Sequence, residues 1–342
     1  MSYAVFVSFF PQLIAGPIVH HKDLIPQFFK ARKLVLNYKN LCLGLFIFTI
    51  GLVKKAIIAD KFAIWVGDGF DSANNLTLLT SWLVSFCYTF QLYFDFSGYC
   101  DMAVGSALFF NIKLPINFNS PYKALSIKDF WRRWHITLST FLRDYLYFPL
   151  GGSRKGSFRT YLNLFIVFFI TGIWHGASWK YVMYGIYYCL IMILGLLTEP
   201  LFRKLFEKMH VNREGKIYKA LQVVRTFIFV NIGMLMFRAD DLKIFGQMFI
   251  SMFRNLSWDP IRYGELFDVR IGMSDFLLLL FGAIVLLLVG LYQEQGRHIR
   301  EDIATKNIVF RWVLYYGLIF SVIILGAYGS GYEVAGFIYA QF

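Results

Sequence analysis

The sequence has 342 residues, of which 58% are hydrophobic and only 16% are charged, with a net charge of +13 at pH 7. A soluble chain usually carries about 25% charged residues, so this composition excludes an ordinary water-soluble protein and indicates that lipid surrounds much of the fold. The basic residues concentrate between apolar runs, which argues against nucleic acid as a partner and for the membrane surface.

Six uncharged apolar runs approach the roughly 20 residues that a membrane helix needs. In chain order they occupy residues 2–19, 72–94, 160–179, 181–198, 276–293 and 312–332. The first run contains Pro11, Gly16 and Pro17, and proline and glycine interrupt a helix. We therefore expect a break within it.

Two further segments complete the pattern. Residues 41–59 form a predicted span with Lys54 and Lys55 near one end, and residues 226–237 are short enough for a tilted or re-entrant segment. The whole pattern predicts an all-α, polytopic transmembrane helical bundle with seven to nine membrane segments. We expect it to form one domain over residues 1–342.

Two strongly basic segments lie between these runs. Residues 113–160 hold nine Lys or Arg against Asp129 and Asp144, and residues 199–219 hold six against three Glu. Basic loops stay in the cytoplasm and contact anionic headgroups, which is the first interpretation. The second is a binding surface for an anionic donor, such as the phosphates of a coenzyme.

Residues 129–148 have the periodicity of one amphipathic helix. Its apolar stripe consists of Trp131, Trp134, Leu138, Phe141, Leu142 and Tyr145. Arg132 and Arg133 lie on the polar side, and His135 lies at the edge of the stripe next to Arg132 and Ser139. A helix rich in Trp and Arg is typical of the membrane interface, and its histidine is either functional or incidental.

The segment TGIWHGASW, residues 171–179, carries His175 as the only ionisable group between Arg159 and Lys180. An ionisable residue at membrane depth is a functional-site hypothesis by default. The alternative is a histidine that is hydrogen-bonded to a neighbouring helix. Small residues on both sides of Trp174 and His175 permit close approach of another backbone or of a thin acyl chain, which favours a site.

A third cluster, QLYFDFSGYCDMAVG, spans residues 91–105. Asp95 and Asp101 bracket Ser97 at the end of a predicted span. One interpretation is a polar lining of the same cavity as the histidines. The other is a helix end, with Asp95 or Ser97 capping the next helix.

Metal and nucleotide motifs are absent from the sequence. The segment PLGGSRKG at 149–156 lacks the spacing of a phosphate-binding loop, no G-x-S-x-G elbow occurs, and neither CxxC nor HExxH is present. We predict no metal site and no bound cofactor.

An ordered set of motifs resembles the membrane-bound O-acyltransferase family, in particular its bacterial branch with alginate O-acetyltransferase and the D-alanyl transfer protein of teichoic acid. The matching stretches are SFFPQLIAGPIV (8–19), LYFDFSGYCDMAVG (92–105), LPINFNSPYKALSIKDFWRRWHITLSTFLRDYLYFPLGG (114–152), GIWHGASW (172–179) and YGSGYEVAGFIYAQF (328–342). The alginate-type acetylase is the closer match. Family members begin with further membrane helices, so the resemblance implies a chain that is short at its N-terminus.

The resemblance implies a ring of tilted helices with interfacial and re-entrant segments around a thinned centre. His175 takes the place of the catalytic histidine, and His135 takes the place of the second polar residue. His175 is then the general base, and His135 orients the acceptor or donates to the developing oxyanion. Arg132 and Arg133 are candidates to hold donor phosphates. Further candidates for donor or acceptor binding are Trp174, Asp95 and Ser97.

The expected reaction moves an acetyl group from a cytoplasmic thioester donor, acetyl-CoA or another acyl thioester, to a hydroxyl for O-acetylation of an alginate-like exopolysaccharide. The expected partners are the polysaccharide or a periplasmic acetyltransferase that relays the acetyl group, together with membrane lipid, in the bacterial inner membrane. One alternative is D-alanyl transfer from a carrier protein to teichoic acid. Another is a transporter with a proton-relay histidine, although transporters usually show internal repeats and the sequence shows none.

Overall fold

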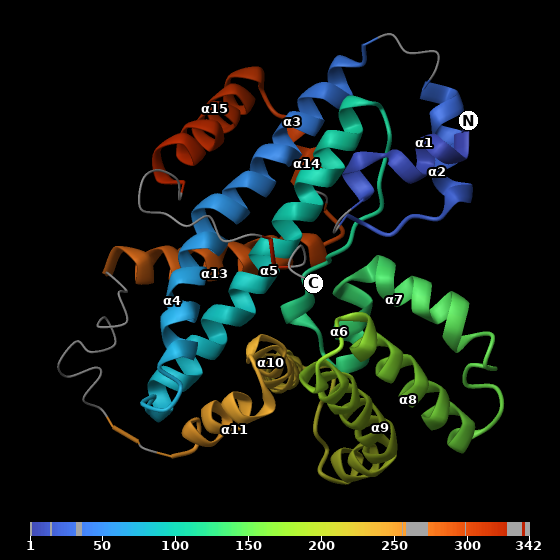
Figure 1. The fold of residues 1–342 in the computed structure, drawn as a ribbon, viewed down its shortest axis with the longest axis vertical. Helices are drawn as coiled ribbons and strands as arrows, with labels where there is room; N and C mark the ends of the chain where they lie inside the picture. The colour runs from blue at the N-terminus through green and yellow to red at the C-terminus, as the bar shows by residue number, and fades with distance from the viewer. Residues whose placement is uncertain are drawn as a thin grey trace. The chain divides into compact units, whose positions relative to one another are not determined.

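The computed structural model describes residues 2–13, 16–31, 36–254, 256–257, 273–297, 299–326 and 337–338, and helices dominate these ranges (Figure 1). The chain divides into two compact units. The first unit comprises Met1–Asp68, Cys87–Asn119 and Asp259–Phe342, and the second comprises Gly69–Phe86 and Ser120–Trp258. The single domain over residues 1–342 stays a prediction.

Most helices of the first unit come from the two ends of the chain. They are α1 (Ser2–Ser8), η1 (Phe10–Gln12), α2 (His21–Ala31), α3 (Tyr38–Leu52), η2 (Val53–Ala59), α4 (Asp60–Asp71), most of α5 (Leu78–Phe109), α13 (Met273–Glu294), α14 (Ile299–Ala304) and α15 (Ile308–Leu325). A hydrophobic core joins α2, α3 and α5 through buried residues that include Leu24, Ile47 and Leu108. The first apolar run is interrupted before Pro11, as its prolines predict.

Paired glycines bring α3 and α5 into close contact within the first unit. A Cβ on Gly44 would meet the backbone oxygen of Gly105 at 2.7 Å, and a Cβ on Gly98 would meet the backbone oxygen of Gly51 at 2.8 Å. Both separations are shorter than real Cβ contacts, so only glycine permits this approach. Small residues allow the same close helix contacts in membrane proteins generally.

The second unit contains the segments singled out for their histidines. Its helices are η3 (Pro121–Lys123), α6 (Ile127–Arg133), α7 (Ile136–Leu142), η4 (Arg143–Tyr147), α8 (Ser157–Trp174), α9 (Trp179–Lys208), α10 (Lys216–Arg238) and α11 (Leu242–Ser251). Helices α8 and α9 lie side by side as a hairpin (Figure 1). Gly172 faces the backbone of Tyr181, and Gly185 faces the backbone oxygen of Phe168. The space beside Gly172 is therefore filled by α9.

The prediction of one continuous helix over residues 129–148 is wrong. Helix α6 ends at Arg133, Trp134 is extended, and His135 adopts a left-handed conformation before α7 begins. Trp134 is buried and stacks on Phe130 with ring centroids 5.6 Å apart, whereas Tyr145 is exposed. Burial of Trp134 and His135 therefore outweighs the preference for a continuous amphipathic helix.

Several predicted bounds also need correction. Helix α8 ends at Trp174 and not at residue 179, so His175 caps the helix and does not lie inside it. The predicted connector 199–219 is helical up to Lys208, and the short run 226–237 belongs to the longer helix α10.

Fewer spans are found than predicted. Within the described residues, five helices are long and apolar enough to cross a membrane, against the seven to nine expected. They are Tyr38–Asp71, Ser157–Trp174, Trp179–Lys208, Lys216–Arg238 and Ile308–Leu325, with Leu280–Gln293 as a shorter apolar helix. The predicted run 72–94 corresponds to α5, which continues to Phe109. The motif at 328–342 lies outside the described residues except for Phe337 and Ile338.

Candidate active site

His175 lies at the C-terminal end of α8, where the chain turns toward α9. Its backbone N–H donates to the carbonyl oxygens of Thr171 at 3.3 Å and Gly172 at 3.1 Å, which closes the last helical turn. Gly176 follows with φ +144°, a conformation that side-chain-bearing residues rarely adopt. This turn places the His175 side chain inside the unit, where the residue is only 4% exposed.

Aromatic rings surround the imidazole of His175. The centroid of Phe237 lies 5.0 Å away at an interplanar angle of 90°, and that of Tyr184 lies 5.7 Å away at 88°. Trp174 lies 4.9 Å away and Tyr181 6.2 Å away. The rings come from α8, α9 and α10, so three helices fix the orientation of one imidazole.

His135 occupies the break between α6 and α7. It has φ 44° and ψ 53°, in the left-handed region that is uncommon for residues with a side chain, and it is 3% exposed. The break belongs to none of the five candidate spans. Burial, followed by the neighbouring charge of His175, lowers the pKa of His135 to about 3. The imidazole is therefore neutral near pH 7.

Trp174 connects the two histidines. Its ring centroid lies 5.9 Å from that of His135 and 4.9 Å from that of His175. The residue is 50% exposed, so it contacts two buried imidazoles and also reaches the surface of the unit. The structure thus brings together three predicted site residues that are separated by up to 40 positions in the sequence.

The predicted arginines behave differently from each other. Arg133 forms an ion pair with Asp129 at 3.0 Å, one helical turn away, and Asp129 also accepts the backbone N–H of Leu125 at 3.0 Å. Arg133 therefore helps to build the start of α6. Arg132 is exposed on the same helix.

Asp95 and Ser97 belong to the first unit, so the structure does not place them relative to the histidines. Both lie inside α5, and the alternative that either one caps a helix end is wrong because the helix continues to Phe109. Asp95 pairs with Lys55 at 2.7 Å and accepts the backbone N–H of Ile338 at 2.9 Å. Lys55 also pairs with Asp60 at 2.7 Å.

Sequence reasoning named Trp174 but missed the other aromatic rings around His175. Tyr181, Tyr184 and Tyr188 recur at spacings of three and four, which places them on one face of α9 and is a signal that the sequence carries. Phe237 gives no comparable local signal, because it reaches His175 from a helix that lies later in the chain.

The basic loop before α8 lies at the opposite end of that helix from His175. Asn163 donates from Nδ2 to the carbonyl oxygens of Leu150 at 3.3 Å and Gly152 at 2.9 Å, which ties the loop before α8 to that helix. Because α8 has 18 residues, its two ends are separated by about 27 Å at 1.5 Å per residue.

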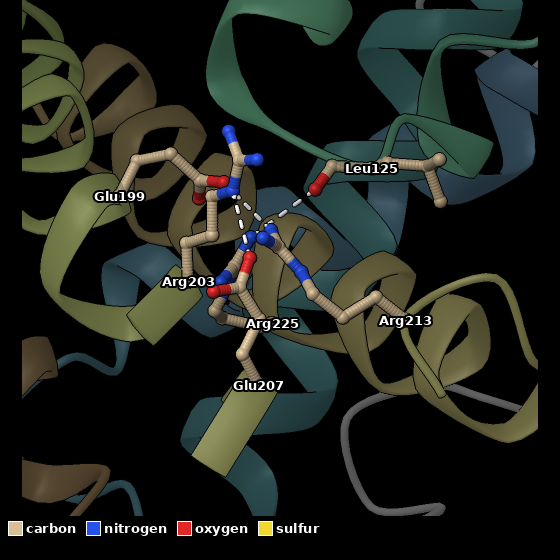
Figure 2. A network of polar contacts seen from close by, with 6 residues as sticks. All are labelled: Leu125, Glu199, Arg203, Glu207, Arg213 and Arg225. Carbon is tan, nitrogen blue, oxygen red and sulfur yellow. Dashed lines mark hydrogen bonds and ion pairs between the residues drawn. The ribbon is translucent and has the colours of Figure 1, made fainter. Parts of the chain in front are cut away.

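A charged cluster occupies the corresponding end of α9 and α10 (Figure 2). Arg203 pairs with Glu207 at 3.0 Å, Arg213 pairs with Glu199 at 2.7 Å, and the third guanidinium lies beside them. That third group, Arg225, donates to the carbonyl oxygen of Leu125 at 3.1 Å. The exposed carboxylates neutralise part of the basic charge that the sequence places here.

In the described residues, apolar helices long enough to cross a membrane occur together with two buried histidines on either side of Trp174. The molecule is therefore a helical membrane protein with a buried histidine site. The chain is a member of the membrane-bound O-acyltransferase family, whose model matches residues 1–237.

Relatives of the chain include three bacterial proteins. The chain is 54% identical over 243 residues to the peptidoglycan O-acetyltransferase of Helicobacter pylori, covering 71% of this chain and 45% of that protein. It is 38% identical over 295 residues to the probable alginate O-acetylase AlgI of Pseudomonas aeruginosa, covering 86% and 53%. It is 31% identical over 239 residues to the teichoic acid D-alanyltransferase of Bacillus subtilis, covering 68% and 60%. The chain thus spans about half the length of the first two.

Proposed function

We propose that this protein is an O-acetyltransferase that moves an acetyl group from a cytoplasmic thioester, such as acetyl-CoA, to a hydroxyl group destined for a glycan of the bacterial cell envelope. The observation that carries this proposal is the pair of buried histidines that share Trp174 in a member of this family. The proposed location is the inner membrane, and the hydroxyl belongs to the glycan itself or to a periplasmic relay protein.

In the proposed reaction, the acceptor oxygen attacks the thioester carbonyl while neutral His175 takes the hydroxyl proton. The carbon–oxygen bond forms, the carbon–sulfur bond breaks, and the thiolate leaves and recovers a proton. A hydroxyl is a poor nucleophile at neutral pH, and a histidine suits the role of its base. His135, across Trp174, is placed in the proposal as the group that orients the acceptor or donates to the oxyanion.

The relatives favour acetyl over D-alanyl transfer. The relative with 54% identity is named a peptidoglycan O-acetyltransferase, and the relative with 38% identity is named a probable alginate O-acetylase. The teichoic acid D-alanyltransferase is 31% identical. These names support an envelope or extracellular glycan as the final acceptor, with peptidoglycan as the first to test. The test measures the acetate that mild base releases from isolated peptidoglycan and from exopolysaccharide of a gene-deletion strain. The polymer that has lost its acetate in this strain is the acceptor.

The decisive experiment measures free thiol released from acetyl-CoA by the purified full-length protein with an acceptor present. Loss of a general base costs about 100- to 10,000-fold in rate, so we expect His175→Ala to abolish transfer and His135→Ala to impair it severely, both at normal abundance. His20→Ala and His21→Ala serve as matched controls and should stay near the wild-type rate. An active His175→Ala protein would remove this mechanism, and transport of a solute without thioester consumption would favour the transporter.

A further inference from the structure

Lys180 joins two helices at the end of the second unit that carries His175. It lies in the first turn of α9, and its Nζ donates to the carbonyl oxygen of Ala239 at 2.8 Å. Ala239 caps the C-terminal end of α10, directly after Arg238. The same ammonium lies over the ring of Tyr181, 4.8 Å from its centroid. One side chain therefore holds the start of α9 to the end of α10.

The residues next to this hydrogen bond are the ones that contact the imidazole. Tyr181 directly follows Lys180, and Phe237 precedes Ala239 by two positions. The rings of Tyr181 and Phe237 lie 5.2 Å apart, and both contact His175. The hydrogen bond thus closes a ring of contacts that runs from α9 through Phe237 to the proposed base.

The chemistry of Lys180 indicates that the donor, and not the alkyl chain alone, is needed there. Lys180 is half-buried, and partial removal of an ammonium from water is costly unless it is hydrogen-bonded, a cost that an unbranched apolar side chain of similar length would not carry. The nearby carboxylate of Asp240 pairs with Arg238 at 3.2 Å. The bond that Lys180 makes in this structure is to a backbone carbonyl, which an apolar residue cannot replace.

We propose that Lys180 is a positioning residue for acyl transfer. By holding the end of α10 against the start of α9, it keeps Phe237 and Tyr181 against His175 and so sets the direction in which the imidazole faces the acceptor hydroxyl. The expected effect on the rate of acyl transfer rests on the proposed function, whereas the expected effect on the packing around His175 does not.

The kinetic test compares Lys180→Met, which keeps the length and removes the donor, with Lys180→Arg, which restores a donor. Because a misplacement of about 1 Å can cost on the order of 100-fold in rate, we expect Lys180→Met to lower kcat about 10- to 100-fold with KM for acetyl-CoA nearly unchanged. Lys180→Arg should recover most of the rate. Lys243→Met, at an exposed position in the first turn of α11 and outside both basic segments, is the matched control and should equal wild type.

A second measurement does not depend on activity. Diethyl pyrocarbonate modifies accessible histidines, and mass spectrometry identifies which residue is modified. His175 is buried and should be protected in the wild type and in Lys180→Arg, but modified several-fold faster in Lys180→Met at unchanged helix content. If the wild-type protein shows no acyl transfer, the proposed function is wrong, but the labelling of His175 still decides whether Lys180 positions it. Equal protection in Lys180→Met, or equal impairment by Met and Arg, would overturn the inference.

Discussion

At the scale of single residues, the backbone at His135 is the least common feature of the site. A residue with a β-carbon pays about 1–2 kcal/mol for the left-handed conformation, and such strained residues cluster at functional sites. His135 is held there with its side chain buried beside Trp174. The strain orients an imidazole that a continuous helix would direct elsewhere, and this links the break after α6 to the proposed chemistry.

The titration of His135 gives a prediction about stability. Its pKa is lowered to about 3 in the folded protein by burial and by His175, while an unfolded histidine titrates near 6.5. The unfolded state therefore binds more protons between these values, and stability is lost as the pH falls from about 6.5 toward 3. Thermal unfolding in detergent between pH 4 and 8 should show a shallower decline for His135→Gln than for wild type. Parallel declines would contradict this assignment.

At the scale of secondary-structure elements, the α8–α9 hairpin depends on Gly172 and Gly185, which lie at the contact between the two helices. A methyl group on Gly185 would collide with the backbone oxygen of Phe168, which cannot move aside as a side chain can. A Cβ on Gly195, on the same helix, would meet no atom within 4 Å beyond the neighbouring backbone of α9 itself. The two positions therefore differ in tertiary contact while sharing the same helical backbone.

This difference predicts opposite effects of one substitution. Gly195→Ala should keep or raise the midpoint of thermal unfolding, because alanine is favoured over glycine within a helix by up to about 1 kcal/mol. Gly185→Ala should lower the midpoint, because α8 and α9 must separate, and it should also lower acyl transfer since Tyr184 contacts His175. Equal midpoints for the two variants would show that the hairpin is looser than its contacts indicate.

Local patterns in the sequence predicted the long apolar helices but not their ends or partners. The runs at 160–179 and 181–198 correspond to α8 and α9, because apolar length alone defines a span. The end of α8 at Trp174 depends on the turn at Gly176, and the break at His135 depends on the burial of Trp134. Such tertiary contacts leave no periodic signal. His135 and His175 could be chosen as site candidates from rarity and family resemblance, whereas Phe237 required the fold.

At the scale of the whole molecule, charge and helix length determine how the chain crosses the membrane. Helices α8 and α9 contain 18 and 30 residues, and about 20 residues span the hydrocarbon core. Basic residues concentrate in the loop before α8 and from the end of α9 to the start of α10, whereas the α8–α9 turn lies at the other end. Because basic loops remain in the cytoplasm, the His175 end of the hairpin should face the periplasmic half, from which the proposed acceptor arrives.

Cysteine labelling tests this orientation at three exposed serine or asparagine positions, Ser153, Ser178 and Asn212. Cys42 is the exposed one of the four native cysteines, so the substitutions belong in a Cys42→Ser background. In intact spheroplasts an impermeant maleimide should label Ser178→Cys and leave Ser153→Cys and Asn212→Cys unmodified until the cells are lysed. The reason is that two crossings return the chain to the side from which it started. Labelling of both Ser153→Cys and Asn212→Cys before lysis would invert the orientation, and labelling of only one of them would mean that the hairpin does not cross twice.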